Sequence, residues 1–458
     1  MTLLQDGMVL TAGRMTEEIG RQVAAAIADL VPSAPAAGGG ASLTRHVATN
    51  RITGMFGYAV GDITVDQTYH HVRTLESAPA WVRFVWPYDK DDTCTIVGAL
   101  VAPTASVASP LAPVDSTGSP VSWTTVTFNN GGDPLTLAEQ LALEDEQAGA
   151  DVTTIALNVP PLNGIEWPSS DRFKDHGHLY SDWIPVAHYP RTDTVGAPPA
   201  IMDRVYFSGA PSASQAVSAS WHAAAGSRLC RTYVNAGDCI TDPTDFVSTS
   251  VNTSLLGTPI VQYITASPTI TVAVVGDSTQ AVQLNHVSKA VLALSSAAQP
   301  IEVAVWATGG YQAEAYCGNM RRCLAATQPA VVFIEMRSPN GNLNLADMES
   351  DWQVGMQLAE AVKAYGGVPV LMTPLPCPAR ATTAAHEESL RTISTRCRAA
   401  EAAGARILDL DAYYTNGATP IAGFRTGTSD DGLHPNQAGQ DACAVDITIP
   451  LLRDILGL

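Results

Sequence analysis

Three side chains of this sequence are of the types that cleave acyl bonds by nucleophilic attack. Ser278 follows closely on the apolar run 271–275, and Asp431 lies three residues before His434 near the other end of the same region. One turn is enough to bring the Asp431 carboxylate to a ring nitrogen of His434. A hydroxyl, an imidazole that removes its proton and a carboxylate that orients the imidazole form a nucleophilic triad. The sequence therefore predicts Ser278 as nucleophile, His434 as base and Asp431 as the residue that orients it.

The run 271–275 predicts a buried parallel strand that positions Ser278. Its β-branched residues suit a strand covered on both faces, and open α/β sheets bind ligands at the carboxyl ends of such strands. Gly276 permits a tight turn there, and Asp277 is interpreted as a turn-holding side chain that bonds nearby backbone amides. Ser278 is then expected at the mouth of a helix, where free N–H groups favour negative charge. The alternative for Ser278 is an ordinary helix N-cap.

The segment 431–436 predicts a loop that leads into a helix. Pro435 suits the first position of a helix, so His434 is expected on the loop just ahead of it. The alternative is a capping or surface histidine, with Asp431 as a turn residue. The presence of Ser278 earlier in the same region favours the catalytic interpretation.

Residues from about 268 to 458 resemble the SGNH hydrolase superfamily, whose members are also called GDSL esterases and lipases. The family's first block is matched by Gly-Asp-Ser at 276–278, and its last block, Asp-x-x-His, by 431–434. Pro-Asn-x-x-Gly, which often follows, is present at 435–439. The resemblance implies a flavodoxin-like three-layer α/β/α sandwich with a parallel five-stranded sheet. It also implies hydrolysis of carboxylic esters through an acyl-enzyme on Ser278.

The resemblance further implies an oxyanion hole with three donors. The backbone N–H groups of Ser278 and Gly310 supply two of them, and Gly310 is preferred to Gly309 on the loop after the second strand. The side-chain amide of Asn340 supplies the third, with Asn342 as the fallback, because the usual glycine and aspartate of the third block are absent. Without the other blocks, Gly309 and Gly310 would be interpreted as an ordinary turn between a strand and a helix. Preorganised donors of this kind contribute several kcal/mol, typically about 3 for one donor.

Apolar runs and helical stripes alternate through this region. Strands are predicted near 270–275, 301–306, 330–335, 368–373 and 406–410, and helices at Gln280–Ala297 and Leu345–Tyr365. Alternation of this kind predicts a parallel sheet with helices on both faces and right-handed crossovers. The candidate residues then converge on one edge of the sheet. Pro450 predicts a break or a second short helix in the last helical stretch.

The first half of the chain has a different pattern of short alternating runs and turn clusters, which is typical of an all-β sandwich or jelly roll. Examples of these runs are 80–86, 121–128, 181–189 and 227–234. Ahead of them, Thr16–Leu30 predicts an amphipathic helix. We therefore expect an N-terminal helical or irregular segment, a β-sandwich accessory domain and the catalytic domain, at residues 1–50, 51–262 and 263–458.

Tryptophans gather in the β-rich part at positions 81, 86, 123, 167 and 183. One interpretation is a surface that binds carbohydrate or another polymer. The other, which we prefer, is that these side chains pack in the core or against the catalytic domain. The function of the β-rich part is open at this point.

Other residues that bind metals or act as nucleophiles do not predict a second chemistry. Asp175, His176 and His178 suggest a metal site, but two histidines without a clear third ligand favour a solvated loop or one that leans over the catalytic mouth. Cys377 follows the fourth strand without a local basic partner. We therefore expect no metal and no cofactor.

The eight cysteines leave the redox compartment open. Cys230 with Cys239, and Cys317 with Cys323, are candidate disulfide pairs, although a cytosolic protein could carry all eight reduced.

Composition limits the partners. The chain has 458 residues, of which 25 are basic and 44 acidic, giving a formal net charge of −19. Such a charge argues against nucleic acid or an anionic membrane surface as partner. No apolar run predicts a membrane span, and the early leucines, interrupted by Asp6, do not form a signal peptide. Secreted and cytoplasmic locations, and the oligomeric state, stay open.

These features favour a serine esterase that acts on short-chain carboxylic esters such as acetylated carbohydrate. The alternative within enzymes is a lipase or thioesterase that takes longer acyl chains. The alternative outside enzymes is a carbohydrate-binding or structural protein on a decayed hydrolase scaffold, for which the irregular third block is the only hint.

Overall fold

The computed structural model describes most of the C-terminal half and the strands of the N-terminal half. The described residues are 4–5, 8–9, 46–50, 55–56, 67–89, 95–108, 111–128, 176–208, 217–218, 230–247, 254–255, 259–265, 268–281, 284–310, 312–313, 316–318, 320, 324, 328–340, 343–415 and 423–458. The predicted helix Thr16–Leu30 lies outside them, as do Trp167, Asp175, Cys323 and Asn342.

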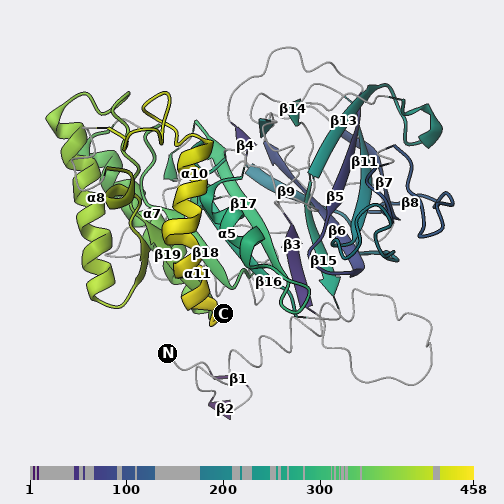
Figure 1. The fold of residues 1–458 in the computed structure, drawn as a ribbon, viewed down its shortest axis with the longest axis horizontal. Coiled ribbons are helices and arrows are strands. Elements are labelled where there is room, and N and C mark those ends of the chain that lie inside the picture. The colour runs from purple at the N-terminus through teal and green to yellow at the C-terminus, as the bar shows by residue number, and fades with distance from the viewer. Residues whose placement is uncertain are drawn as a thin grey trace.

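A parallel sheet of five strands forms the centre of the C-terminal part (Figure 1). Across the sheet its strands are β17 (Ile301–Gly309), β16 (Ile270–Gly276), β18 (Val331–Glu335), β19 (Val368–Met372) and β20 (Arg406–Leu408). Numbered along the chain, the order is 2-1-3-4-5, which is the flavodoxin-like order. The predicted parallel five-stranded sheet is thus confirmed. The short strand β4 (Met55–Phe56) pairs in parallel with the end of β17.

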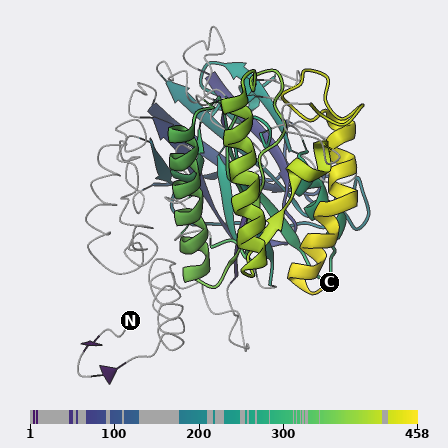
Figure 2. The same ribbon diagram turned by 90° about the vertical axis from the view of Figure 1, so that its left-hand side faces the viewer.

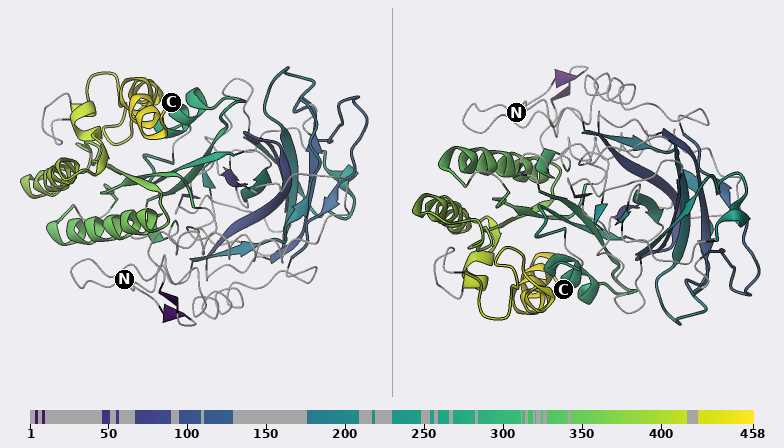
Figure 3. Two further views of the ribbon diagram at one scale, coloured as in Figure 1. Left: turned by 90° about the horizontal axis from the view of Figure 1, so that it is seen from below. Right: turned by 90° about the horizontal axis from the view of Figure 1, so that it is seen from above.

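Helices cover both faces of this sheet, as the end-on views of Figure 3 show. On one face lie α5 (His286–Leu294), α9 (Leu410–Thr415), α10 (Gln437–Cys443) and α11 (Ile449–Leu456), and on the other α7 (Leu345–Ala364) and α8 (Ala384–Ala402). Figure 2 shows α7 and α8 side by side in front of the sheet. The three layers follow from the alternation of apolar strands with amphipathic helices.

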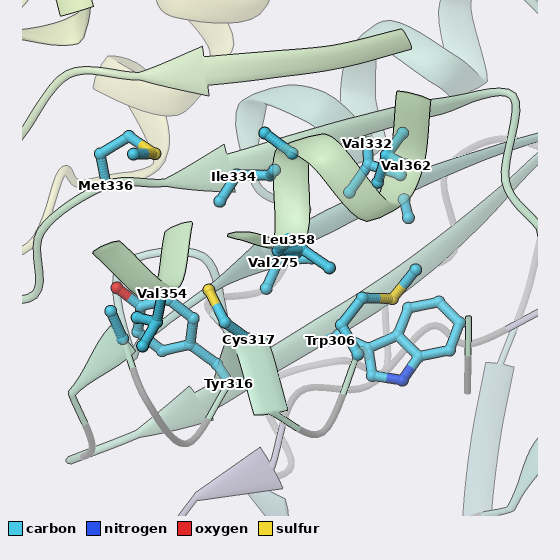
Figure 4. Packing of buried hydrophobic residues seen from close by; sticks show 14 of the residues in the cluster. Val275, Trp306, Tyr316, Cys317, Val332, Ile334, Met336, Val354, Leu358 and Val362 are labelled. Carbon is cyan, nitrogen blue, oxygen red and sulfur yellow. The ribbon is translucent and has the colours of Figure 1, made fainter. Parts of the chain in front are cut away.

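Strand β16 illustrates how the sequence builds both cores. Its side chains alternate between the faces of the sheet, so Val272 and Val274 enter the cluster under α5, whereas Ala273 and Val275 enter the cluster under α7. Figure 4 shows the second cluster, in which α7 side chains such as Leu358 pack over β16, β17 and β18. Both faces of β16 are buried, which explains the continuous apolar run in its sequence.

The helix predicted at Gln280–Ala297 is shorter in the structure. The Asn285 side chain accepts a hydrogen bond from Ser288 N and caps α5, so the helix begins at His286. The residues before it belong to the turn after β16. At the C-terminus, a π-helical segment η6 (Ala444–Thr448) runs directly into α11, and Pro450 is the second residue of α11.

The N-terminal half contains two antiparallel sheets of five strands each. The first holds β3 (His46–Asn50), β6 (Pro79–Asp89), β9 (His176–Tyr180), β10 (Ile184–Pro185) and β15 (Ile260–Thr265), and the second β5 (Gln67–Thr74), β7 (Thr95–Thr104), β8 (Thr124–Thr125), β11 (Ala200–Ser208) and β13 (Cys230–Ala236). One hydrophobic cluster joins both sheets, with Phe84 and Tyr263 from the first and Tyr69 and Val205 from the second. The predicted strands at 121–128 and 181–189 shrink to the two-residue strands β8 and β10.

The remaining short elements are β1 (Leu4–Gln5), β2 (Met8–Val9), β12 (Val217–Ser218), β14 (Ser254–Leu255) and the 3-10 turn η4 (Pro243–Asp245). Within the residues described above, no helix has the length and apolarity needed to cross a membrane.

The first antiparallel sheet packs against strand β17. Glu302 of β17 is buried and accepts hydrogen bonds from the Tyr263 hydroxyl at 2.5 Å and from Glu76 N at 3.0 Å. Val85 and Ile260 join the hydrophobic cluster that contains Trp306 of β17. The first antiparallel sheet therefore shares both a core and a buried polar contact with the parallel sheet.

Candidate active site

Ser278 lies just past the end of β16, where the strand order of the sheet reverses between β17 and β18. Such a reversal is where open α/β sheets bind ligands. Gly276 ends the strand, and the structure corrects the reason for it. Its φ is not positive, but a Cβ at this position would lie 2.4 Å from both Glu335 Oε2 and Gln280 Cγ. Glycine is needed because of this close packing, and a tight turn is not the reason.

Asp277 organises the turn around the serine. Its Oδ1 accepts from Thr279 N at 2.7 Å, which agrees with the predicted turn-holding role. Its Oδ2 accepts from the Ser338 hydroxyl at 2.7 Å and from Asn340 Nδ2 at 3.0 Å. The carboxylate therefore joins the turn after β16 to the loop after β18.

Glu335, the last residue of the neighbouring strand β18, holds the same turn through two hydrogen bonds. Its Oε2 accepts from Asp277 N at 2.8 Å and its Oε1 from the Thr279 hydroxyl at 3.1 Å. Burial raises the pKa of Glu335 well above its usual range, and the nearby Asp277 carboxylate raises it further. Burial also raises the pKa of Asp277, although the hydrogen bond from Ser338 opposes that change. Three hydrogen bonds to Asp277 favour its charged form, whereas burial and the Asp277 carboxylate both disfavour the charge on Glu335.

The structure brings Ser278, His434 and Asp431 into one hydrogen-bonded chain. Ser278 Oγ lies 2.9 Å from His434 Nε2, and His434 Nδ1 lies 2.7 Å from Asp431 Oδ2. Because an ionised carboxylate only accepts hydrogen bonds, the ring proton sits on Nδ1 and Nε2 is the acceptor for the serine hydroxyl. The His434 side chain is 31% exposed and Ser278 is 9% exposed, so solvent reaches the imidazole while the serine is nearly buried.

The carboxylate of Asp431 is ionised at neutral and mildly acidic pH. Partial burial acts to raise its pKa, but hydrogen bonds from the His434 ring and from the backbone amides of His434 and Leu433 outweigh this effect and lower the pKa to about 2. The intervening Gly432 has φ 70°, a conformation that favours glycine, so the loop can fold back on itself.

Helix α10 fixes the histidine loop against the serine turn. Asn436 caps the helix by accepting from Gly439 N at 2.9 Å. Gly439 has no room for a side chain, because a Cβ would lie 2.5 Å from Thr428 O. Gln440 then donates from Nε2 to Thr279 O at 3.4 Å and accepts from His286 N at 2.8 Å. Helix α10 thus joins the loop that carries His434 to the segment that carries Ser278.

The predicted oxyanion donors lie on the same edge of the sheet. In the parallel register Gly276 faces Ala307, so Gly310 follows β17 by about as much as Ser278 follows β16. Gly310 adopts φ 81°, whereas Gly309 is still part of β17 and pairs with β4. Asn340 is partly buried next to Asp277.

The structure also shows the surroundings of the cysteines and histidines that were considered as nucleophiles, disulfide partners or metal ligands. Cys377 is buried, and burial raises the pKa of its thiol to about 12, so the thiolate that a nucleophile requires is disfavoured. Cys239 and Cys317 are free buried thiols. No group of three histidine, cysteine or carboxylate side chains within the described segments could hold a metal. His176 and His178 lie in β9, but their side chains are outside what the structure describes.

The tryptophans fall into different environments. Trp86 is buried in the core shared by the antiparallel sheets, beside Phe84 and Phe128. Trp123 packs 4.6 Å from the buried Arg204 guanidinium. Trp183 lies 4.7 Å from Arg83 and is half-buried. The packing interpretation therefore holds for Trp86 and Trp123.

Sequence reasoning missed Glu335 and Gln440. Glu335 had a signal, because an acidic residue at the end of a buried apolar strand is rarely tolerated without a partner. Gln440 had none, since its contacts with Thr279 and His286 appear only once the helices pack.

No family model and no curated protein match this chain. Among solved structures, a GDSL-like lipase from Bacteroides thetaiotaomicron is 15% identical, covers 41% of this chain and 87% of its own, and has a TM-score of 0.32. The esterase EstA from Pseudoalteromonas sp. is 16% identical, covering 41% and 99%, with a TM-score of 0.33. The chain is structurally similar to GDSL-type lipases and acylhydrolases.

A further solved structure, of a Bacillus subtilis protein, is 14% identical and covers 85% of this chain and 78% of its own, with a TM-score of 0.32. Similarity at this level carries no conclusion about activity, which has to come from the side chains of the site.

Proposed function

We propose that the protein is a carboxylic ester hydrolase with Ser278 as nucleophile, His434 as general base and acid, and Asp431 as the residue that orients His434. The observation that carries this proposal is the continuous hydrogen-bonded chain, 2.9 Å from Ser278 Oγ to His434 Nε2 and 2.7 Å from His434 Nδ1 to Asp431 Oδ2. Each distance is within the range required for direct proton transfer or orientation.

The reaction proceeds in two halves. Ser278 Oγ attacks the ester carbonyl while His434 Nε2 takes its proton, and the ionised Asp431 stabilises the resulting imidazolium. The tetrahedral intermediate collapses, and His434 returns the proton to the departing alcohol. Water then enters, loses a proton to His434 and attacks the acyl group on Ser278, which releases the acid and restores the serine.

The tetrahedral oxyanion needs donors, which we assign to the backbone N–H groups of Ser278 and Gly310 and to the Asn340 amide. Support for Asn340 comes from its hydrogen bond to Asp277, which fixes the plane of the amide beside the nucleophile. An amide nitrogen carries two hydrogens, and we assign the second to the oxyanion. Gly310, with no Cβ, lets the backbone approach the substrate closely.

Replacing Asn340 by alanine is expected to lower kcat by about 10²–10³-fold with little change in KM, because the donor acts mainly in the transition state. Steady-state kinetics with p-nitrophenyl acetate measures this effect. Asn235→Ala, the same substitution in β13, is the control and should keep normal kinetics. If Asn342→Ala lowers kcat and Asn340→Ala does not, the donor has been assigned to the wrong asparagine.

We propose short-chain esters, such as acetylated carbohydrate, as the substrate class. The support is the segment after β19, where Pro374 and Pro376 are buried and Ala379, directly after Pro378, donates from N to Gly432 O of the histidine loop at 3.3 Å. We propose that this segment lines the acyl site. Because its prolines fix φ, it cannot readily move aside for a long acyl chain.

An acyl-length series from p-nitrophenyl acetate to palmitate, with acetylated xylan added, tests the substrate class. We expect kcat/KM to be highest for the shortest chains and to fall steadily with length. A maximum at palmitate would favour a lipase or thioesterase. Absence of all turnover, together with no labelling of Ser278 by a fluorophosphonate, would favour the non-catalytic scaffold.

We also infer that the two antiparallel sheets form an accessory β-sandwich domain fixed on the catalytic part. Its support is the core that both sheets share and the buried contact of Tyr263 and Glu76 with Glu302. A domain fixed in this way would hold the edge of the catalytic sheet in place.

A further inference from the structure

A buried ion pair lies behind the loops that carry the proposed oxyanion donors. Arg337, directly after the loop's first residue Met336, donates from Nη1 to Asp351 Oδ2 of helix α7 at 2.5 Å. The two side chains are 0% and 1% exposed. The proposed reaction uses neither of them.

Asp351 contacts both donor loops. Its Oδ1 accepts from Ala313 N at 3.2 Å, three residues after Gly310. The backbone amide of Ser338, two residues before Asn340, also donates to its carboxylate. Asp351 is therefore a common acceptor for the loop after β17 and the loop after β18.

Helix α7 gives Asp351 a rigid base. One turn later, Val354 and Leu358 are fully buried against the parallel sheet (Figure 4). The position of the carboxylate is thus set by the core of the domain and does not depend on the loops that it holds.

Stabilisation of the fold alone does not explain why this ion pair is buried. Burial raises the pKa of Asp351 to about 6 despite the opposing effect of Arg337, which shows that the charge is costly to bury. A buried ion pair is often no more stabilising than apolar residues of the same size. A geometric role accounts for it better, since no apolar side chain could accept the amides of Ala313 and Ser338.

We propose that Asp351, with its partner Arg337, is a positioning residue that holds the loops of Gly310 and Asn340 in the geometry required for oxyanion binding. This inference rests on the proposed esterase function. It predicts that loss of the carboxylate impairs the transition state more than it impairs substrate binding.

The first test is Asp351→Asn with p-nitrophenyl acetate. We expect kcat to fall about 10- to 100-fold, as for misplacement of groups by about 1 Å, with KM changed by less than about threefold. The control is Asp203→Asn in β11, which alters another buried aspartate paired with an arginine, Arg73 at 2.9 Å. A loss of stability alone would affect both variants in the same way, whereas positioning lowers kcat only at residue 351.

A double-mutant cycle with Asn340→Ala decides whether Asp351 acts through the donor. If it does, Asp351→Asn costs clearly less in the Asn340→Ala background than in the wild type. Fully additive losses, or an unchanged kcat in Asp351→Asn, would overturn the proposal.

Since Asp351→Asn removes the negative charge that faces the buried Arg337, it could fail to fold, and the double substitution Arg337→Met with Asp351→Leu then replaces it. Hydrogen exchange of residues 310–313 and 337–340 gives a readout that does not need turnover. Faster exchange there, with β20 and α8 unchanged, supports positioning, and unchanged exchange refutes it. A wild type that neither hydrolyses esters nor reacts with a fluorophosphonate would refute the esterase instead.

Discussion

Replacing Ser278 by alanine is expected to lower kcat for p-nitrophenyl acetate on the order of 10⁶-fold, as loss of a triad nucleophile does in other serine hydrolases. The hydroxyl is the only group in the site placed 2.9 Å from His434 Nε2, among the residues the structure describes. Without it no acyl-enzyme forms, and the residual rate comes from direct attack of water on the ester, whose oxyanion the donors still stabilise.

The alanine variant should fold normally, because the Ser278 side chain lies at the edge of the core while the surrounding turn is held by Asp277 and Glu335. Intact mass after treatment with a fluorophosphonate should show one adduct in the wild type and none in the variant. Ser288→Ala, which removes a buried hydroxyl from the nearby helix α5, is the matched control and should keep both turnover and adduct. Unaltered turnover in Ser278→Ala would exclude this serine as the nucleophile.

Replacing His434 by alanine is expected to be nearly as severe, because members of a triad act as a unit and their losses are not additive. Ser278 remains, but nothing removes its proton at neutral pH. The double variant Ser278→Ala with His434→Ala should therefore be no slower than either single variant. Stopped assays over long incubations with purified protein measure such low rates.

Added imidazole distinguishes a base from a structural histidine. The His434 side chain is 31% exposed, so free imidazole can enter the space it leaves and restore part of the rate. Removal of the exposed His188, by His188→Ala, should change nothing and is the control. Normal kinetics in His434→Ala would show that another group is the base.

The parallel sheet was predictable because its strands are buried on both faces and read as continuous apolar runs. The two antiparallel sheets of the N-terminal half were less predictable. The run 181–189 alternates like a strand, yet its ladder with β6 covers only Ile184–Pro185. On either side the chain keeps single backbone bonds to β6, from Ser181 N to Phe84 O and from Val186 N to Ala80 O. The helix predicted from Gln280 begins later because the capping residue Asn285, and not the apolar periodicity, sets its start.

The site divides in a similar way. The proximity of Ser278, Asp431 and His434 was predictable because each lies in a short local motif, and their catalytic roles stay a prediction. The supporting contacts were not predictable. Glu335 reaches Asp277 across 58 positions, and Asp351 reaches Ala313 across 38. Such pairs depend on which strands become neighbours, and no local pattern encodes that choice.

The contact at Glu302 bears on how a minimal enzyme can be made from this chain. Cutting before β16 would strip this carboxylate of the Tyr263 hydroxyl and expose one long rim of the catalytic sheet to other chains. A truncated product would then be prone to aggregate even with its catalytic residues intact. The first antiparallel sheet thus shields the border strand of the parallel sheet from other chains.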